Sequence, residues 1–236
     1  MRTVIIGLGG IGTYLAEPIC RIVSSSQSPR ASRRIVLVDG DKYEERNRER
    51  QIFRQTAANK AQETAERLKD FFPNLEIEFK PKYISGENVF LFIKEDDVVF
   101  LAVDNHATRK IVSDRVATLD NALLISGGNE LRDGNTQIYR RGGGKDITPP
   151  LTFMHPEIEF PRDKNPADLH CGEMVDSGIT QVLAANLAAA SMMVSVYSLW
   201  LQEGKTPHFE IYFDILTGSA RSATLPKDFS TSTKGE

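Results

Sequence analysis

The sequence predicts an α/β fold with a mostly parallel sheet, helices on both of its faces, and an antiparallel portion toward the C-terminus. Short apolar segments alternate with segments of helical periodicity from residue 3 to residue 126, which is typical of parallel sheets covered on both faces. A glycine-rich turn follows the first apolar segment, as expected where a strand leads directly into a helix. Beyond residue 129 the sequence changes to a hairpin pattern, a long irregular segment and a long apolar helix.

Each predicted element is an apolar run or a stretch of helical spacing between turn-forming residues. The predicted strands span residues 3–6, 34–38, 75–80, 97–103, 122–126 and 208–213. The predicted helices span residues 11–23, 55–72, 107–119 and 182–201. Residues 129–141 resemble a hairpin that turns at Asp133-Gly134, and residues 142–170 are rich in Gly, Pro and charge. We expect one domain over residues 1–225, followed by a flexible polar tail over residues 226–236.

The charge balance and the cysteines limit the classes of function. The chain has 236 residues, and its 29 basic residues nearly balance its 32 acidic ones, so nothing indicates a nucleic-acid partner or an anionic membrane surface. No Cys-x-x-Cys pair occurs, which excludes a cysteine-rich zinc site within one chain. Cys20 and Cys171 are predicted to be free thiols, and we expect a cytoplasmic protein.

The apolar segment at residues 182–201 has no charge and is long enough to span a bilayer. It is nevertheless rich in Ala and Ser, it contains Asn186, and no basic cluster flanks it. We therefore expect a buried core helix and no association with a membrane.

The glycine-rich turn, Gly-Leu-Gly-Gly-Ile-Gly, predicts a nucleotide-binding site. Its glycines are Gly7, Gly9, Gly10 and Gly12. Residues without a side chain let the backbone approach a phosphate, and the following helix N-terminus supplies N–H donors. Asp39 ends the next predicted strand, where a carboxylate can accept both hydroxyls of a ribose. This combination indicates a Rossmann-like fold and an adenine nucleotide, and it leaves a dinucleotide and ATP both open.

A dense group of charged and amide side chains follows Asp39. Its candidate ligand-binding members are Asp41, Asn47, Arg50, Gln51 and Lys60. A dinucleotide has no obvious use for these cations, whereas a nucleoside triphosphate does. Arg50 can hold phosphate oxygens in a bidentate fork, and Lys60 can neutralise the charge that develops as pyrophosphate leaves. Asp104 ends a later strand and suits a Mg²⁺ ion that bridges phosphates, although it could instead cap the next helix.

These motifs, taken in order, resemble those of the ThiF/MoeB family, which includes the adenylating domains of ubiquitin-activating enzymes. The matching segments are GLGGIG, DGDKYEERNRERQ, the Asn-Lys pair at residues 59–60, and AVDNHATR, which ends at Arg109. The resemblance covers about residues 2–225 and is strong in the first half. It implies that the glycines line the nucleotide, that Asp39 binds the ribose, and that Asp104 holds Mg²⁺. The residues that would contact the phosphates are Asn47, Arg50 and Lys60. Asn105 and Arg109 match the pattern and could serve only to shape their loop.

The resemblance implies that a carboxylate attacks the α-phosphate of ATP, giving an acyl adenylate and pyrophosphate. In this family the carboxylate often belongs to the C-terminal glycine of a ubiquitin-like or sulfur-carrier protein, and the acyl group then passes to a thiol. Cys171 is the candidate thiol here, with His170 beside it, although a lone cysteine is more often structural. Because relatives are dimers, we expect a homodimer.

Two other classes of function remain open. A nicotinamide-dependent (NAD) oxidoreductase would use the same glycine turn, but no hydride-transfer site is evident in the sequence. A catalytically silent scaffold could bind a nucleotide or a ubiquitin-like partner, but the complete set of charged residues disfavours it. A small-molecule or tRNA-base carboxylate is also possible as the substrate.

Overall fold

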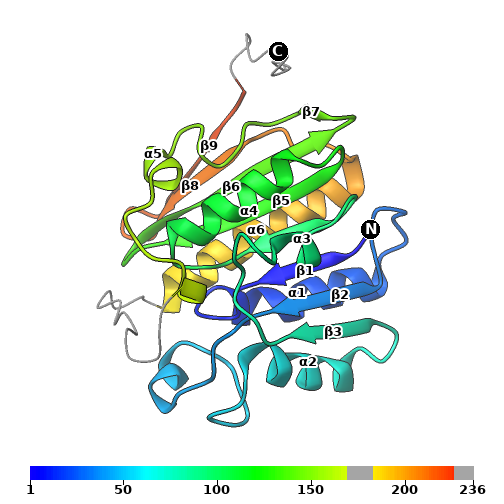
Figure 1. Ribbon diagram of the computed structural model, residues 1–236, viewed down its shortest axis with the longest axis vertical. Coiled ribbons are helices and arrows are strands. Elements are labelled where there is room, and N and C mark those ends of the chain that lie inside the picture. Colours follow the sequence, from blue (N-terminus) through cyan, green and yellow to red (C-terminus); the bar gives the residue numbers. More distant parts are fainter. Residues whose placement is uncertain (169–182, 226–236) are drawn as a thin grey trace.

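The structure is a computed structural model that describes residues 1–168 and 183–225 (Figure 1). Its strands are β1 (Thr3–Ile6), β2 (Arg34–Val38), β3 (Glu76–Lys80), β4 (Val98–Leu101), β5 (Ala122–Asn129), β6 (Asp133–Gly142), β7 (Lys145–Asp146), β8 (Glu210–Asp214) and β9 (Ser219–Ala223). Its helices are α1 (Gly12–Ser25), α2 (Lys60–Phe71), α3 (Val89–Phe92), α4 (His106–Ala117), α5 (Pro156–Glu159) and α6 (Leu183–Glu203). Two short 3₁₀ helices are η1 (Glu45–Glu49) and η2 (Pro166–Asp168).

In the described residues the strands form one sheet, in the order β3-β2-β1-β4-β5-β6-β8-β9, and β7 pairs with β6. The first five strands of this order pair with one another in parallel, and the pairs from β5 to β9 are antiparallel. The predicted α/β fold, with a parallel first half and an antiparallel C-terminal portion, is confirmed. The chain crosses from β3 on one side of β1 to β4 on the other, and this reversal opens the edge where ligands bind in such sheets.

Helices cover both faces of the sheet, and each face has its own apolar core. Helices α1, α2 and α6 pack on one face, and α3, α4 and α5 pack on the other. Helix α1 illustrates why these helices pack on the sheet. Its Leu15, Ile19 and Val23 recur every four residues and are all buried. Burying each such aliphatic side chain stabilises the fold by about 1.5–3 kcal/mol. The cores therefore fix the helix that follows the glycine turn.

Helix α6 is the uncharged segment that the sequence left ambiguous. By length and composition alone it could cross a membrane. In the structure it packs against α1 and β5, and Ala189, Met193 and Tyr197 are buried in the core shared with the sheet. Tyr197 makes an edge contact with Phe100 of β4, at 5.2 Å between ring centroids. The packing is that of the predicted core helix.

Helix α2 begins five residues later than its apolar spacing suggested. The prediction placed its start at Gln55, but the helix starts at Lys60. Asn59 adopts an extended conformation and caps the helix, since its side chain accepts a hydrogen bond from the N–H of Gln62 at 3.1 Å. Ala57 has a φ of +62°, which a helix does not allow. Lys60 therefore lies at the N-terminus of the helix.

The hairpin between β5 and β6 turns earlier than predicted. Asp133 and Gly134 belong to β6, and Gly134 pairs with Asn129, so the turn lies at residues 130–132. Position 134 has no room for a side chain. A Cβ there would lie 2.3 Å from the carbonyl oxygen of Gly128 and 2.6 Å from the ring of Phe213. The Asp-Gly pair, a common turn signal, therefore reflects close strand packing in this chain.

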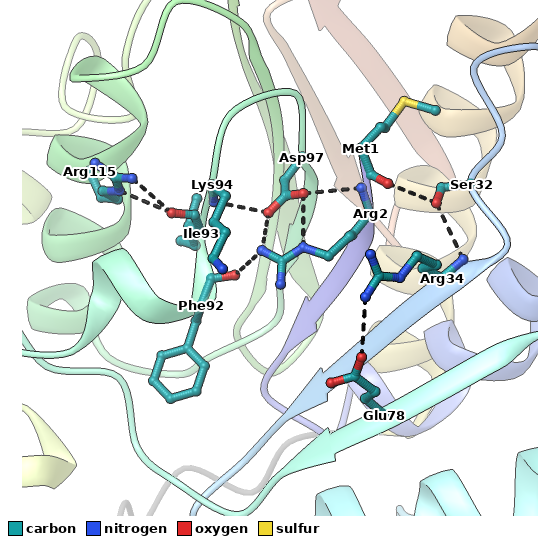
Figure 2. A network of polar contacts seen from close by, with 10 residues as sticks. All are labelled: Met1, Arg2, Ser32, Arg34, Glu78, Phe92, Ile93, Lys94, Asp97 and Arg115. Atoms are coloured by element: carbon teal, nitrogen blue, oxygen red, sulfur yellow. Dashed lines mark hydrogen bonds and ion pairs between the residues drawn. The ribbon is translucent and has the colours of Figure 1, made fainter.

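A polar network joins the strands at the edge opposite the glycine turn (Figure 2). Asp97 is buried, and its carboxylate accepts hydrogen bonds from the backbone N–H of Arg2 at 3.0 Å and from the guanidinium of Arg2 at 2.5 Å. The same guanidinium donates to the carbonyl of Phe92 at 3.0 Å. These contacts set the register between β1 and β4, on which the alignment of their other ends depends.

The irregular segment after β6 is anchored over its described part. Thr148, Leu151 and Ile158 are buried, and Asn165 donates to the carbonyl of Ile84 at 3.0 Å. The predicted polar tail, residues 226–236, lies outside the described residues. The predicted domain limit at residue 225 stays a prediction.

Candidate nucleotide-binding site

The predicted site residues lie where neighbouring parallel strands end. Ile6 at the end of β1 pairs with Val38 of β2 on one side and with Leu101 of β4 on the other. The loops that start after these residues carry the glycine turn, Asp39 and Asp104. Because parallel strands share one direction, these loops leave the sheet side by side (Figure 1).

The glycines of the turn meet two different requirements. Gly7 has a φ of +86°, and a Cβ there would lie 2.7 Å from the carbonyl oxygen of Ala102. A Cβ on Gly12 would lie 1.9 Å from the carbonyl oxygen of Gly7, so both are needed for the turn to fold. Gly9 and Gly10 are partly exposed, and a Cβ on Gly9 would meet no atom within 4 Å. No side chain caps the start of α1. The N–H groups of Thr13 and Tyr14 donate to the carbonyl oxygens of Gly9 and Ile11, so the N–H groups of residues 9–12 are the ones available to an anion.

Asp39 is buried, and its carboxylate ties the loops together. Oδ2 accepts a hydrogen bond from the N–H of Leu8 at 2.6 Å, and Oδ1 accepts one from the N–H of Asp41 at 2.8 Å. Burial raises the pKa of Asp39 to about 6, against the opposing effect of nearby Lys60. Each ionised oxygen has two lone pairs, so each can accept one further hydrogen bond from a ribose hydroxyl.

Lys60 is also buried, and it lies next to these aspartates. Its Nζ is 3.1 Å from Oδ2 of Asp41. The side chain of Asn59 donates to the carbonyl oxygens of Asp39 and Asp41, at 2.9 and 3.0 Å. The start of α2 is thus bonded to the segment that follows β2, which holds the Lys60 ammonium beside Asp41.

The segment that follows β2 is folded back onto α1. Asn47 is buried, and its Oδ1 accepts a hydrogen bond from the N–H of Glu44 at 2.9 Å, which closes the first turn of η1. The N–H of Ile52 donates to the hydroxyl of Thr13, in the first turn of α1, at 3.0 Å. These two contacts fix the backbone on both sides of residues 50 and 51.

Arg50 and Gln51 lie between these contacts, next to the N-terminus of α1. Arg50 is partly buried, and its side chain makes no hydrogen bond or ion pair with the residues described here. Gln51 is buried, and its Oε1 has no partner in the same part of the chain. Because buried polar groups are normally paired, the unpaired amide oxygen of Gln51 indicates a place for a polar ligand, and the partly buried guanidinium of Arg50 is available to contact it.

Asp104 is exposed in the loop between β4 and α4. Asn105 caps α4, since its Oδ1 accepts a hydrogen bond from the N–H of Thr108 at 2.8 Å. The capping position considered as an alternative for Asp104 thus belongs to its neighbour. The Asp104 carboxylate makes no hydrogen bond within the described residues, which leaves it available to a cation.

Arg109 shapes this loop from inside the protein. It is buried and donates to the carbonyl oxygens of Val103 and Gly127, at 2.6 and 2.8 Å, and to the hydroxyl of Ser126 at 2.7 Å. Burial lowers its pKa to about 10, while Asp104 opposes this effect, so it remains charged at neutral pH. With all these donors engaged, Arg109 positions the loop that presents Asp104.

Two further contacts at the site had no signal in the sequence, because their partners are far apart in the chain. The carboxylate of Asp163 accepts hydrogen bonds from the N–H groups of His106 and Ala107 at the start of α4, at 2.7 and 2.9 Å. The hydroxyl of Tyr83 donates to the carboxylate of Asp41, 42 residues away. Neither residue belongs to a recognisable motif.

The predicted metal site at Asp104 and the predicted thiol Cys171 both stay predictions. In residues 1–168 and 183–225 no group of three or more His, Cys, Asp or Glu side chains could hold a metal ion. A Mg²⁺ ion at Asp104 would therefore take its other ligands from phosphates and water, as is usual for this ion. Cys171 and His170 lie outside the described residues. Cys20 is buried, and burial raises the pKa of its thiol to about 12, so it is unreactive at neutral pH.

A match to a protein-family model identifies the family to which this chain belongs. The model of the ThiF family matches residues 1–232. The chain belongs to the ThiF family. The resemblance indicated by the four sequence motifs is confirmed, and the match extends over the antiparallel half of the sheet.

Relatives of this ThiF-family chain include larger proteins. The Adenylyltransferase and sulfurtransferase MOCS3 of Drosophila yakuba is 30% identical over 199 residues, which cover 81% of this chain but only 39% of that protein. The Sulfur carrier protein adenylyltransferase of Thermus thermophilus is 24% identical over an alignment that covers 95% of this chain and 79% of that protein. The chain thus spans about two fifths of the length of the Drosophila relative.

Solved structures share the fold. Escherichia coli MccB with ATP superposes with a TM-score of 0.70 at 17% identity, covering 99% of this chain and 66% of that one. PaaA superposes with a TM-score of 0.67 at 14% identity, covering 95% and 64%. At these identities the likeness shows the Rossmann-like fold alone.

Proposed function

We propose that this ThiF-family protein uses Mg·ATP to adenylate a carboxylate, and that the carboxylate is the C-terminal glycine of a ubiquitin-like or sulfur-carrier protein. One observation carries the proposal. Hydrogen bonds join the glycine turn, Asp39 and the start of α2 at one sheet edge, where Arg50 and Asp104 make no hydrogen bond or ion pair among the described residues.

The residues at this edge suit ATP and Mg²⁺. Gly9 has open space for a phosphate, and Asp39 retains acceptor capacity for a ribose. Arg50 and Lys60 supply positive charge for the β- and γ-phosphates. An exposed, unpaired carboxylate is what Mg²⁺ needs when phosphates provide most of its ligands, and Asp104 is such a group.

In the proposed reaction an oxygen of the substrate carboxylate attacks the α-phosphorus of ATP. A bond forms between that oxygen and phosphorus, the bond from the α-phosphorus to the bridging oxygen breaks, and pyrophosphate leaves with the electron pair. The protein contributes position and charge neutralisation, which supply most of the catalysis in reactions of this kind. Bound Mg²⁺ would withdraw charge from the phosphates. Arg50 and Lys60 would stabilise the departing pyrophosphate.

The names of relatives support this substrate class. The Thermus thermophilus relative is named a sulfur carrier protein adenylyltransferase, and MccB has been solved with ATP and with MccA. We further propose that the protein is a cytoplasmic homodimer, and that Cys171 accepts the acyl group from the adenylate. A monomer in light scattering at micromolar concentration would contradict the dimer.

An NAD-dependent oxidoreductase is the competing enzyme class. It would bind its cofactor through the glycine turn and Asp39, and replacing Arg50 by Ala would leave that binding intact. The unpaired state of Arg50 favours the triphosphate instead. A silent scaffold would bind ATP without releasing pyrophosphate.

The deciding experiment is ATP–pyrophosphate exchange with Mg·ATP and candidate ubiquitin-like or sulfur-carrier proteins. Exchange should appear only with the correct acyl acceptor. Asp104→Ala should lower its rate by about 100-fold or more, because a charge-stabilising group is lost. Glu87→Ala, which removes an exposed carboxylate elsewhere, is the matched control. Exchange at the wild-type rate in Asp104→Ala would refute the assignment of Mg²⁺ to this residue.

A further inference from the structure

Tyr83 closes over the peptide that joins the two aspartates after β2. It follows the end of β3, and its ring lies against Gly40, where a Cβ would be 2.6 Å from two of the ring carbons. Gly40 is not among the glycines with positive φ, so space rather than backbone conformation requires a glycine at this position. The Tyr83 ring is therefore fixed relative to Asp39 and Asp41, although 36% of the residue remains exposed.

The hydroxyl of Tyr83 reaches Lys60 through a single carboxylate. It donates to Oδ1 of Asp41, and the other oxygen of Asp41 lies 3.1 Å from Nζ of Lys60. With both oxygens engaged, the Asp41 carboxylate has one orientation. Burial and the contact with Asp41 raise the pKa of Tyr83, so its hydroxyl remains a donor at neutral pH.

The contact with Asp41 leaves N–H donors of the Lys60 ammonium without an acceptor among the described residues. Its side chain is only 10% exposed, whereas that of Asp41 is 46% exposed. An ammonium has three N–H donors, and Asp41 is the one acceptor that the described residues provide for it. A buried cation with open donors requires a further anionic or polar partner. Tyr83 and Asp41 thus fix the direction in which the remaining donors point.

We propose that Tyr83 and Asp41 are positioning residues, which hold Lys60 in the orientation in which its ammonium meets the β- and γ-phosphates of bound ATP. This inference rests on the proposed function, because it requires a nucleoside triphosphate at the glycine turn. The sequence predicted that Asp41 binds the nucleotide. In this proposal Asp41 contacts Lys60 and acts on the nucleotide through it.

The test compares Mg·ATP with AMP, which lacks the β- and γ-phosphates, by isothermal titration calorimetry. Tyr83→Phe keeps the ring and removes the hydroxyl. It should raise the Kd for Mg·ATP by about 3- to 10-fold, the effect expected of one lost hydrogen bond, and leave the Kd for AMP unchanged. Asp41→Ala should act in the same direction. In the Lys60→Met background, Tyr83→Phe should cause no further loss, because its effect passes through Lys60.

Gly40→Ala is a second, independent perturbation, since the added Cβ pushes the Tyr83 ring away from its place. It should reproduce the selective loss of Mg·ATP affinity, and thermal unfolding of each variant verifies that it is folded. Equal losses for Mg·ATP and AMP in Tyr83→Phe would mean that Tyr83 serves the base or ribose, and would overturn the inference. Tighter Mg·ATP binding in Asp41→Ala would mean that Asp41 competes with phosphate for Lys60, and would also overturn it.

The outcome for the wild-type protein separates this inference from the function on which it rests. Binding of Mg·ATP to the wild type, with the same affinity in all variants, would refute the positioning by Tyr83 and Asp41 alone. Failure of the wild type to bind either nucleotide would refute the proposed function and this inference together.

Discussion

The carboxylate of Asp39 allows a quantitative test of ribose binding. It is buried and accepts two backbone N–H groups, and burial raises its pKa from 3.8 to about 6. Because one pKa unit corresponds to about 1.4 kcal/mol, the folded protein disfavours the charged carboxylate by about 3 kcal/mol. Only the ionised form has acceptors free for both ribose hydroxyls, so nucleotide affinity should follow the ionised fraction of Asp39.

Lowering the pH from about 8 to about 5 should weaken Mg·ATP binding roughly tenfold, since the ionised fraction falls from nearly one to about one tenth. Calorimetry at saturating Mg²⁺ and fixed ionic strength measures this change. Two comparisons isolate Asp39. The Asp39→Asn variant and the analogue 2′,3′-dideoxy-ATP should each bind with little dependence on pH over this range, because the first lacks the titrating group and the second lacks the hydroxyls.

A constant affinity for Mg·ATP over this range would refute the reasoning, and so would an equal decline in wild type and Asp39→Asn. The stability of the unliganded protein should change in the opposite sense. A raised carboxyl pKa contributes stability below the unfolded value of 3.8, and this contribution is lost as the pH rises through about 6. The difference in unfolding free energy between wild type and Asp39→Asn should therefore shift by about 3 kcal/mol across that window.

Two further predictions concern stability. Gly12→Ala should lower the free energy of unfolding by about 1–3 kcal/mol, because its Cβ would meet the Gly7 carbonyl oxygen at 1.9 Å. The matched Gly9→Ala variant should cost less than about 0.5 kcal/mol and still weaken Mg·ATP binding, and equal urea-unfolding curves for the two would contradict this account. His155 bonds Glu210 and Glu157, and these carboxylates raise its pKa. Its stabilisation is complete below the ordinary histidine pKa of about 6.5 and is lost as the pH rises through the raised value, so His155→Gln should be most destabilising at acid pH. A urea-unfolding difference that grows with pH would count against this assignment.

The parallel strands, the β5–β6 hairpin, β8 and the helices α1, α4 and α6 were predictable because each buries a face that its own sequence marks. The elements β7, β9, α3 and α5 were not predicted, and the residues of β9 are mostly exposed. The end of β2, with Val36 and Val38 inside the sheet and Asp39 directly after it, shows how sharply apolar residues give way to polar ones. The start of α2 was misplaced because residues 55–59 are bonded to other parts of the chain. Asn59 donates to the carbonyl of Asp39, 20 residues earlier, which no local pattern records.

The residues of the candidate site also fall into two groups, those that the sequence could name and those that only the structure reveals. The glycines, Asp39, Arg50, Lys60 and Asp104 stand in recognisable motifs, so they could be named in advance as candidates. Tyr83 could not be named, since it resembles any partly exposed tyrosine until β3 lies beside β2. Arg109 could be matched to a motif, but its buried hydrogen bonds to Ser126 and Gly127 depend on β4 and β5 being neighbours.

The sequence by itself determined the α/β fold, the glycine turn and the charged residues that follow β2, because these depend on local periodicity and on motif chemistry. Only the tertiary structure decided that Asp41 holds Lys60, that Asn105 rather than Asp104 caps α4, and that Arg50 is left without a partner among the described residues. Hydrogen bonds form between atoms a few ångströms apart, and in a parallel sheet such atoms come from loops separated by whole crossovers of the chain.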